Sequence, residues 1–161
     1  MNKKTTVLFS IATLFATSIY ALSGKVSLTS HSYKEIVVKD KSGHQQHKLI
    51  DTKKVLPGDI VVYHNVIDNG TNKSIKHMVI NNPIPKEMAY ISQSAKCKTP
   101  CKILFSADNG KHFNTPENLT ILTNGVSHIA KPSEYTNVRW ILNKPLAKHQ
   151  KTLVNYKAKL R

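Results

Sequence analysis

The stretch from Val55 to Pro85, VLPGDIVVYHNVIDNGTNKSIKHMVINNPIP, contains the pattern that decides the fold. A Pro-Gly turn at residues 57–58 precedes a run of β-branched side chains over residues 60–67. An Asp-Asn-Gly turn follows, and residues 75–80 form a second apolar run. The Pro-Ile-Pro at residues 83–85 ends that run because proline cannot donate a hydrogen bond to a sheet ladder. We therefore expect two strands of a β-sandwich here.

The remaining sequence continues this alternation of short apolar runs and turns. Strand signals recur roughly every 10 to 15 residues, and no long helical period appears. The run 60–67 is apolar on both alternation sets, which predicts a strand in the middle of a sheet, where His64 and Asn65 need hydrogen-bond partners if buried. Residues 154–160 alternate apolar with polar or basic side chains, which predicts a half-buried strand with a basic outer face. Residues 26–29 and 33–39 predict one or two opening strands, and residues 49–50 begin a short strand that ends at Pro57-Gly58. Further strands are predicted at residues 119–121 and 138–142, with turns at 41–47, 108–110 and 124–125. The pattern predicts an all-β protein, an immunoglobulin-like antiparallel β-sandwich.

Cys97 and Cys101 are the only cysteines, and an even number in an exported chain predicts a disulfide. A strand that starts near Met88 runs to these cysteines and residues 103–105 return from them, so we expect a hairpin clipped at its tip. A redox-active pair usually has two intervening residues rather than three, and a metal pair needs further Cys or His ligands at matched spacing. A loop this small contributes about 2 kcal/mol in the chain-entropy model.

Residues 1–21 have the pattern of a secretory signal peptide. A positive start around Lys3 precedes an apolar stretch over residues 7–16, and residues 18–21 form an end suited to cleavage after alanine. The apolar stretch is shorter than the roughly 20 residues that a spanning helix needs, and no later segment could span a bilayer. We therefore expect a single domain over residues 22–161, exported to the periplasm or the cell surface, without a transmembrane segment.

The chain is strongly basic, with 24 Lys and Arg against nine Asp and Glu. Without the two lysines of the predicted signal peptide, 22 basic residues face nine acidic ones. Such a surface attracts phosphate, lipopolysaccharide, acidic polysaccharide or nucleic acid, and solubility alone is the other explanation. The surplus is concentrated around the cysteines and at the C-terminal end, so the possible polyanion-binding residues are Lys96, Lys98, Lys102, Lys144, Lys148, Lys151, Lys157, Lys159 and Arg161.

Several short motifs follow one another in order between residues 55 and 160. They are Pro57-Gly58-Asp59, Tyr63, Asn69-Gly70, Asn82 to Pro85, Tyr90, Phe105 to Gly110, Tyr135 to Trp140 and Pro145-Leu146. In order and spacing the set resembles the DUF11, or conserved-repeat, family, whose members are immunoglobulin-like modules of bacterial envelope and surface proteins. Asn82 stands where family members usually carry Asp. Glu87 stands where family members usually carry a Gly after the Ile-Pro element. The resemblance implies an immunoglobulin-like fold, and a single copy implies a free periplasmic protein rather than a long surface stalk.

The same residues lack the sequence signatures of catalysis. The chain contains no G-x-S-x-G, H-E-x-x-H, P-loop or G-x-G-x-x-G motif, and a predicted disulfide leaves no cysteine nucleophile. His44 and His47 lack a third metal ligand, and residues 106–113 resemble an Asp-box, which is a structural turn. Histidines on different predicted elements could still meet in space, namely His64, His77, His112 and His128. We predict no catalytic, cofactor-binding or metal-binding residue, and no cofactor.

Two functions remain from these observations. The first is an exported, non-enzymatic β-sandwich module with a structural or protein-interaction role in the bacterial cell envelope, acting through an exposed sheet edge or loops. The alternative is a periplasmic protein that binds acidic polysaccharide or lipopolysaccharide through its basic face. No sequence-specific nucleic-acid contact is expected in either case.

Overall fold

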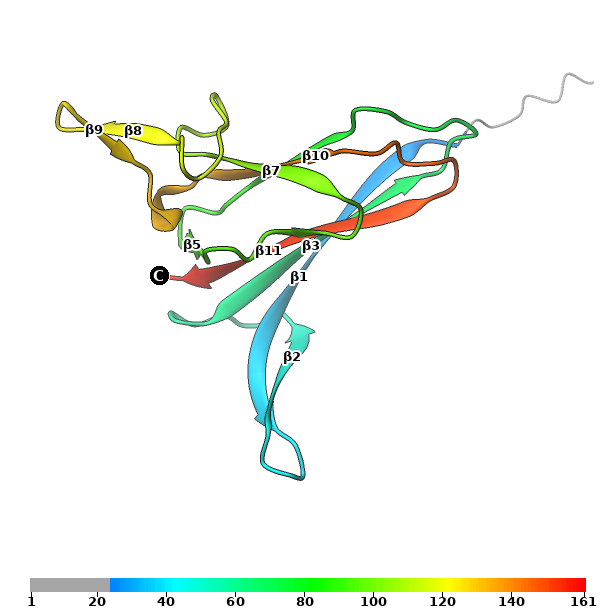
Figure 1. Cartoon of the computed structure of the whole chain (residues 1–161). Coiled ribbons are helices and arrows are strands. Elements are labelled where there is room, and N and C mark those ends of the chain that lie inside the picture. Colours follow the sequence, from blue (N-terminus) through cyan, green and yellow to red (C-terminus); the bar gives the residue numbers. More distant parts are fainter. Residues whose placement is uncertain (1–23) are drawn as a thin grey trace, which may run out of the picture.

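Antiparallel strands make up this protein, and its two largest sheets face each other as a β-sandwich (Figure 1). The structure is a computed structural model that describes residues 24–161, so the predicted signal peptide lies outside the described residues. The larger sheet has the order β2-β1-β3-β11-β5, with β6 also pairing β11, and comprises β2 (Gln45–Asp51), β1 (Val26–Lys39), β3 (Ile60–Asn69), β11 (Lys151–Leu160), β5 (Met88–Tyr90) and β6 (Lys96–Cys97). The smaller sheet has the order β4-β10-β7 and comprises β4 (Val79–Pro83), β10 (Asn137–Leu142) and β7 (Cys101–Ser106). A separate hairpin, β8 (Thr120–Thr123) and β9 (Val126–Ile129), precedes the short helical turn η1 (Pro132–Glu134). The all-β prediction is confirmed.

Strand β3 lies in the middle of the larger sheet, as its apolar pattern predicts. It pairs with β1 on one side and with β11 on the other. Val61 and Val62 point to opposite faces of the sheet, yet they are only 4% and 2% exposed. Both faces are therefore covered at this point, the inner one by the smaller sheet and the outer one by long side chains from neighbouring strands.

The sequence predicts one or two opening strands, and residues 26–39 form one continuous strand of 14 residues. The bounds predicted for the next strand are wrong, because β2 begins at Gln45 instead of Leu49 and ends at Asp51, before Pro57-Gly58. The polar turn predicted over residues 41–47 is therefore wrong in its second half. All seven residues of β2 are exposed, so this strand has no apolar face and no alternation that a sequence pattern could detect.

The second strand of the opening stretch starts later than predicted. Ile75 forms only an isolated bridge to Leu146, and His77 takes a left-handed conformation with φ 53°. The ladder with β10 begins at Val79 and ends at Pro83, where the proline signal predicts an end. The predicted strand over residues 75–80 is therefore wrong for its first four residues.

The predicted hairpin around the cysteines is wrong, although the predicted disulfide is present. β5 and β6 pair with β11 in the larger sheet, whereas β7 pairs with β10 in the smaller one. The chain thus crosses from one sheet to the other between Cys97 and Cys101, whose Cα atoms are 6.3 Å apart. The disulfide therefore fastens the two layers together along one side of the sandwich.

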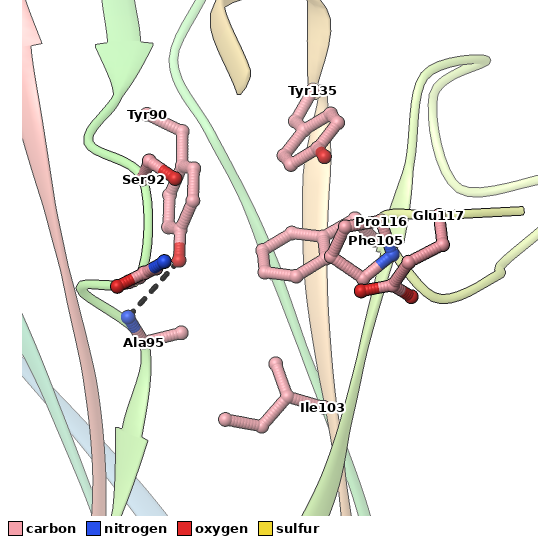
Figure 2. A pocket seen from close by; sticks show the side chains of 9 residues that line it. Tyr90, Ser92, Ala95, Ile103, Phe105, Pro116, Glu117 and Tyr135 are labelled. Atoms are coloured by element: carbon pink, nitrogen blue, oxygen red, sulfur yellow. Dashed lines mark hydrogen bonds between the residues drawn. The ribbon is translucent and has the colours of Figure 1, made fainter. Parts of the chain in front are cut away.

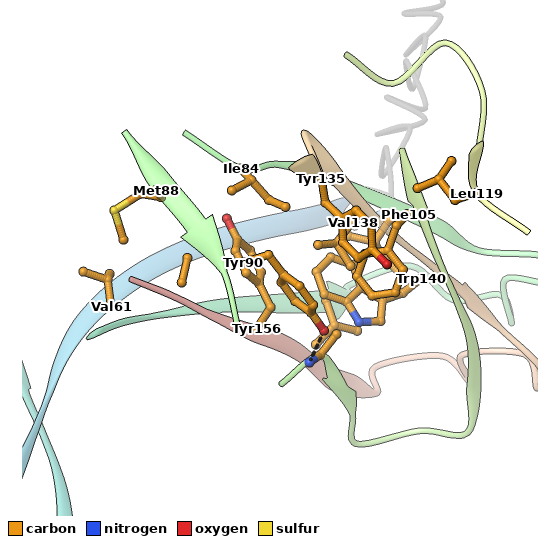
Figure 3. Packing of buried hydrophobic residues seen from close by; sticks show 14 of the residues in the cluster. Val61, Ile84, Met88, Tyr90, Phe105, Leu119, Tyr135, Val138, Trp140 and Tyr156 are labelled. Carbon is orange, nitrogen blue, oxygen red and sulfur yellow. Dashed lines mark hydrogen bonds between the residues drawn. The ribbon is translucent and has the colours of Figure 1, made fainter. Parts of the chain in front are cut away.

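Aromatic side chains from both sheets fill the space between them (Figure 3). Trp140 on β10 and Tyr156 on β11 are both 0% exposed, and their ring centroids lie 6.2 Å apart. Tyr63 stacks on Tyr156 at 4.8 Å. Trp140 and Tyr156 belong to the alternating sets that the sequence assigns to the interior, and Val138 and Val154 on those sets are fully buried as well.

Candidate functional site

A two-stranded arm extends from the larger sheet beyond the sandwich (Figure 1). We define the arm as residues 36–51, which contain the end of β1, a turn and β2. The β1–β3 pairing ends at Glu35 opposite Ile60, so Ile36 to Lys39 pair with β2 alone. No other strand among residues 24–161 pairs with the second edge of β2. The arm therefore presents an open strand edge and both of its faces to solvent.

Local hydrogen bonds build the tip of the arm. The Asp40 carboxylate accepts hydrogen bonds from the backbone N–H groups of Ser42 and His44, both at 2.9 Å. Gly43 supplies the left-handed conformation of the turn, with φ 83°. These contacts define the turn without any packing against the sandwich, so the arm has its own folding signal.

Apolar side chains are exposed along the arm. Val37 is 55% exposed, Leu49 39% and Ile50 37%. Val37 and Leu49 share one face of the hairpin, while Ile50 lies on the other. An isolated two-stranded hairpin is only marginally stable in water, so an arm with exposed apolar groups on both faces is suited to packing against another molecule.

Two of the predicted polyanion-binding residues are paired with acids. The Lys151 ammonium lies 3.0 Å from the Asp68 carboxylate, and the Lys157 ammonium lies 2.5 Å from Glu35. Arg161 donates a hydrogen bond to the carbonyl of Ser133. Their charges are directed to these partners, so the C-terminal strand is less available to a polyanion than its sequence indicates.

Four other predicted lysines gather around the disulfide turn: Lys96, Lys98, Lys102 and Lys144. The Lys98 N–H donates to the Leu153 carbonyl at 2.8 Å, and the Asn143 N–H donates to the Pro100 carbonyl at 3.0 Å, which brings the end of β10 to the turn. None of the four lysines has an ion-pair partner among residues 24–161. Lys148 lies in the turn before β11, and Lys159 lies on the outer face opposite Ile60.

A cleft of about 290 Å³ opens between the edges of the two sheets on the side of the disulfide (Figure 2). Its walls come from the β5–β6 segment and from β7, and the loop before β8 forms its rim. Tyr90, Phe105 and Tyr135 pack against one another here and are only 5–6% exposed, so these rings belong mainly to the core. The Ala95 N–H donates to the Tyr90 hydroxyl at 3.0 Å.

The cleft has a polar rim over this aromatic floor. Glu117 is the one carboxylate among the lining residues, and Gln93 takes a left-handed conformation with φ 59°. Burial, followed by the neighbouring Tyr90 and Glu117, raises the pKa of Tyr135. The lining contains no histidine, cysteine or lysine, and its polar side chains besides the two tyrosines are Ser92, Gln93 and Glu117.

Three of the histidines lie apart from one another, each beside its own carboxylate. His112 pairs with Asp108, His128 with Glu134 and His47 with Glu35. No group of three or more potential metal ligands occurs within residues 24–161. The sequence gives no sign that His31 lies opposite His64 on the outer face of the larger sheet, where burial and then His31 lower the pKa of His64.

Comparison with known proteins identifies no relative of this chain. No protein-family model, no curated protein and no solved structure matches it. The resemblance to the DUF11 family therefore stays a prediction. In the part of the chain that the structure describes, no helix is long and apolar enough to cross a membrane.

Proposed function

We propose that this protein is a non-enzymatic interaction module, exported to the bacterial cell envelope, that binds its partner through the arm. The observation that carries the proposal is the open edge of β2, with all seven of its residues exposed. Natural proteins usually protect such an edge, because its free N–H and C=O groups pair readily with another strand. An edge that is held away from the sandwich is suited to strand addition.

Two features support the proposed compartment. The N-terminal sequence has the pattern of a signal peptide, and the disulfide between Cys97 and Cys101 suits an oxidising environment. An immunoglobulin-like module of the envelope, as the DUF11 resemblance implies, is the context in which an exposed strand edge has a use. We place the protein in the periplasm or at the cell surface.

Photo-crosslinking in intact cells tests the use of the arm. A photoreactive amino acid replaces Val37 in one variant and Leu122, at the exposed β8–β9 hairpin, in a control; these residues are 55% and 72% exposed. We expect illumination to give a defined crosslinked species from position 37 and none from position 122. Equal crosslinking from the two positions, or none from position 37, would contradict the proposal.

The lysines around the disulfide turn favour a second candidate function, the binding of acidic polysaccharide or lipopolysaccharide. Lys96, Lys98 and Lys102 are exposed and have no ion-pair partner within the described residues. The test variant replaces these three lysines with Glu. The control variant replaces Lys39, Lys41 and Lys48 of the arm with Glu, which changes the net charge by the same amount. If this function is correct, only the first variant elutes from an immobilised acidic polysaccharide at much lower salt. Equal shifts would indicate a response to net charge alone.

A further inference from the structure

The direction of the free backbone groups on β2 limits how a partner strand can bind. In an antiparallel ladder, alternate residues direct their N–H and C=O groups to opposite neighbours. The Asp40 N–H donates to the His44 carbonyl at 2.9 Å, which places the even-numbered residues of β2 in the bonded positions toward β1. The odd-numbered residues Gln45, His47 and Leu49 therefore direct both backbone groups to the open edge.

The charges on β2 suit a second copy of the same strand. Two copies related by a twofold axis pair antiparallel, and a single residue then lies opposite itself at the axis. With Lys48 at the axis, two ammonium groups would meet in a closely spaced pair, and like charges directly opposite each other are destabilising. With Leu49 at the axis, the two leucines meet and Lys48 lies opposite the apolar Ile50.

The Leu49 register also supplies an acid for a histidine. It places His47 opposite Asp51 of the other copy, and Asp51 has no ion-pair partner among residues 24–161. His47 already lies 3.3 Å from Glu35 on β1, on the paired side of β2. Asp51 of the second copy would approach the same ring from the open edge, so the imidazole would lie between two carboxylates. Leu49 is 39% exposed in the single chain and would be covered by its counterpart.

We propose that β2 pairs antiparallel with β2 of a second copy, about a twofold axis at Leu49. The two larger sheets then form one continuous sheet through the arms, with mutual hydrogen bonds between the Leu49 backbones and two His47–Asp51 contacts. The inference rests on the proposed function, because it names the partner of the arm. The occupant is a second copy because its own β2 places an apolar residue opposite Leu49, an acid opposite His47 and free backbone groups opposite those of this edge.

Single-cysteine variants test the register. Cys97 and Cys101 are bonded to each other, so a cysteine introduced on β2 is the one free thiol among residues 24–161. Directly opposite hydrogen-bonded residues have Cα atoms about 5.5 Å apart, within the range of a disulfide. We expect mild oxidation of purified Leu49→Cys to give a covalent dimer and matched Lys48→Cys to stay monomeric. A dimer from Lys48→Cys alone, or none from either variant, would overturn the proposal.

Proline at the same position tests the backbone contacts. Because the Leu49 N–H points to the open edge, Leu49→Pro removes no hydrogen bond to β1, so the arm keeps its ladder. By sedimentation equilibrium we expect the unsubstituted protein to self-associate and Leu49→Pro to do so at least about tenfold more weakly, because twofold symmetry removes two hydrogen bonds. Leu49→Val, which keeps the N–H, is the control and should associate like the unsubstituted protein. Equal association by the proline variant, or a monomer in every case, would overturn the inference.

The two proposals fail separately. If position 37 crosslinks only to other proteins in cells and Leu49→Cys gives no dimer, the arm is an interaction site but a second copy is not its partner. If Leu49→Cys dimerises in vitro while position 37 gives no crosslink in cells, self-pairing stands and the proposed function fails.

Discussion

The Lys157 ammonium lies 2.5 Å from the Glu35 carboxylate, although the whole of β3 runs between the strands that carry them. Lys157 sits opposite Val62 and Glu35 sits opposite Ile60, so the lysine side chain runs diagonally over the middle strand. The methylene groups of a lysine can cover apolar surface while its charge reaches a partner. This arrangement explains why Val62, on the outer face, is only 2% exposed.

Loss of this ion pair should destabilise the protein measurably. Glu35→Gln leaves Lys157 without its countercharge on a half-buried surface, and we expect the free energy of unfolding in urea to fall by about 1 to 2 kcal/mol. The control is Lys151→Gln, which breaks the pair with Asp68; Lys151 is 67% exposed, so its loss should cost less than about 0.5 kcal/mol. Equal costs would show that burial does not strengthen the first pair.

The disulfide should stabilise contact between the sheets rather than a hairpin. For a loop of this length we expect the double variant Cys97→Ala and Cys101→Ala to lose about 2 kcal/mol. Its amides at Lys98 and Asn143, which bond to Leu153 and Pro100 across the crossing, should exchange with solvent faster. The amide of Ala130, bonded to Leu119 at the β8–β9 hairpin, is the internal control and should be unchanged. Unchanged exchange at the crossing would mean that the disulfide does not hold the layers.

Asn65 is buried with half of its amide unpaired. Its side-chain oxygen accepts a hydrogen bond from Ser30 at 2.7 Å, but its side-chain nitrogen has no partner and the residue is 1% exposed. Asn65→Val removes the unpaired donor, and the exposed Ser30 hydroxyl returns to water, so we expect a change in unfolding free energy of less than about 1 kcal/mol. Asn65→Asp instead buries a charge and should cost more than about 2 kcal/mol. Thermal unfolding of both variants measures the difference, and a larger loss for Val would contradict this account.

Patterns along one strand predict the interior well. Alternation identifies Val138, Trp140 and Leu142 on β10 and Val154 and Tyr156 on β11, and all of them are buried. Glycine and asparagine likewise mark the turn at residues 124–125, where both φ angles are positive. Strand alternation and turn residues depend on neighbouring positions in the chain, so the sequence is enough to predict them.

The pairing of strands that are far apart in the sequence cannot be predicted from such local patterns. Segments close in sequence on either side of the cysteines look like a hairpin, yet their partners are β11 and β10, far along the chain. β2 has no alternation because both of its faces are exposed, so its sequence does not indicate the candidate site. The partner of Lys157 lies 122 residues away, which no charge pattern along β11 reveals.

The turn that begins at Ser106 should make stability depend on pH in the acid range. The Asp108 carboxylate accepts hydrogen bonds from the His112 and Lys111 backbone N–H groups at 3.0 and 3.1 Å and from the Ser106 hydroxyl at 2.7 Å. The His112 backbone, followed by Ser106, holds the pKa of Asp108 well below its usual range. Because the pKa is lower in the folded than in the unfolded protein, the stabilisation is complete above about pH 5 and is lost as the pH falls through the ordinary aspartate range of about 4 toward the folded-state value. Asp108→Asn should therefore be less stable than the unsubstituted protein at pH 7, by about 1 kcal/mol, and this difference should shrink progressively as the pH falls below about 4. Urea unfolding at a series of pH values measures this, and a constant difference from pH 7 to pH 2 would show that the charge of Asp108 does not contribute.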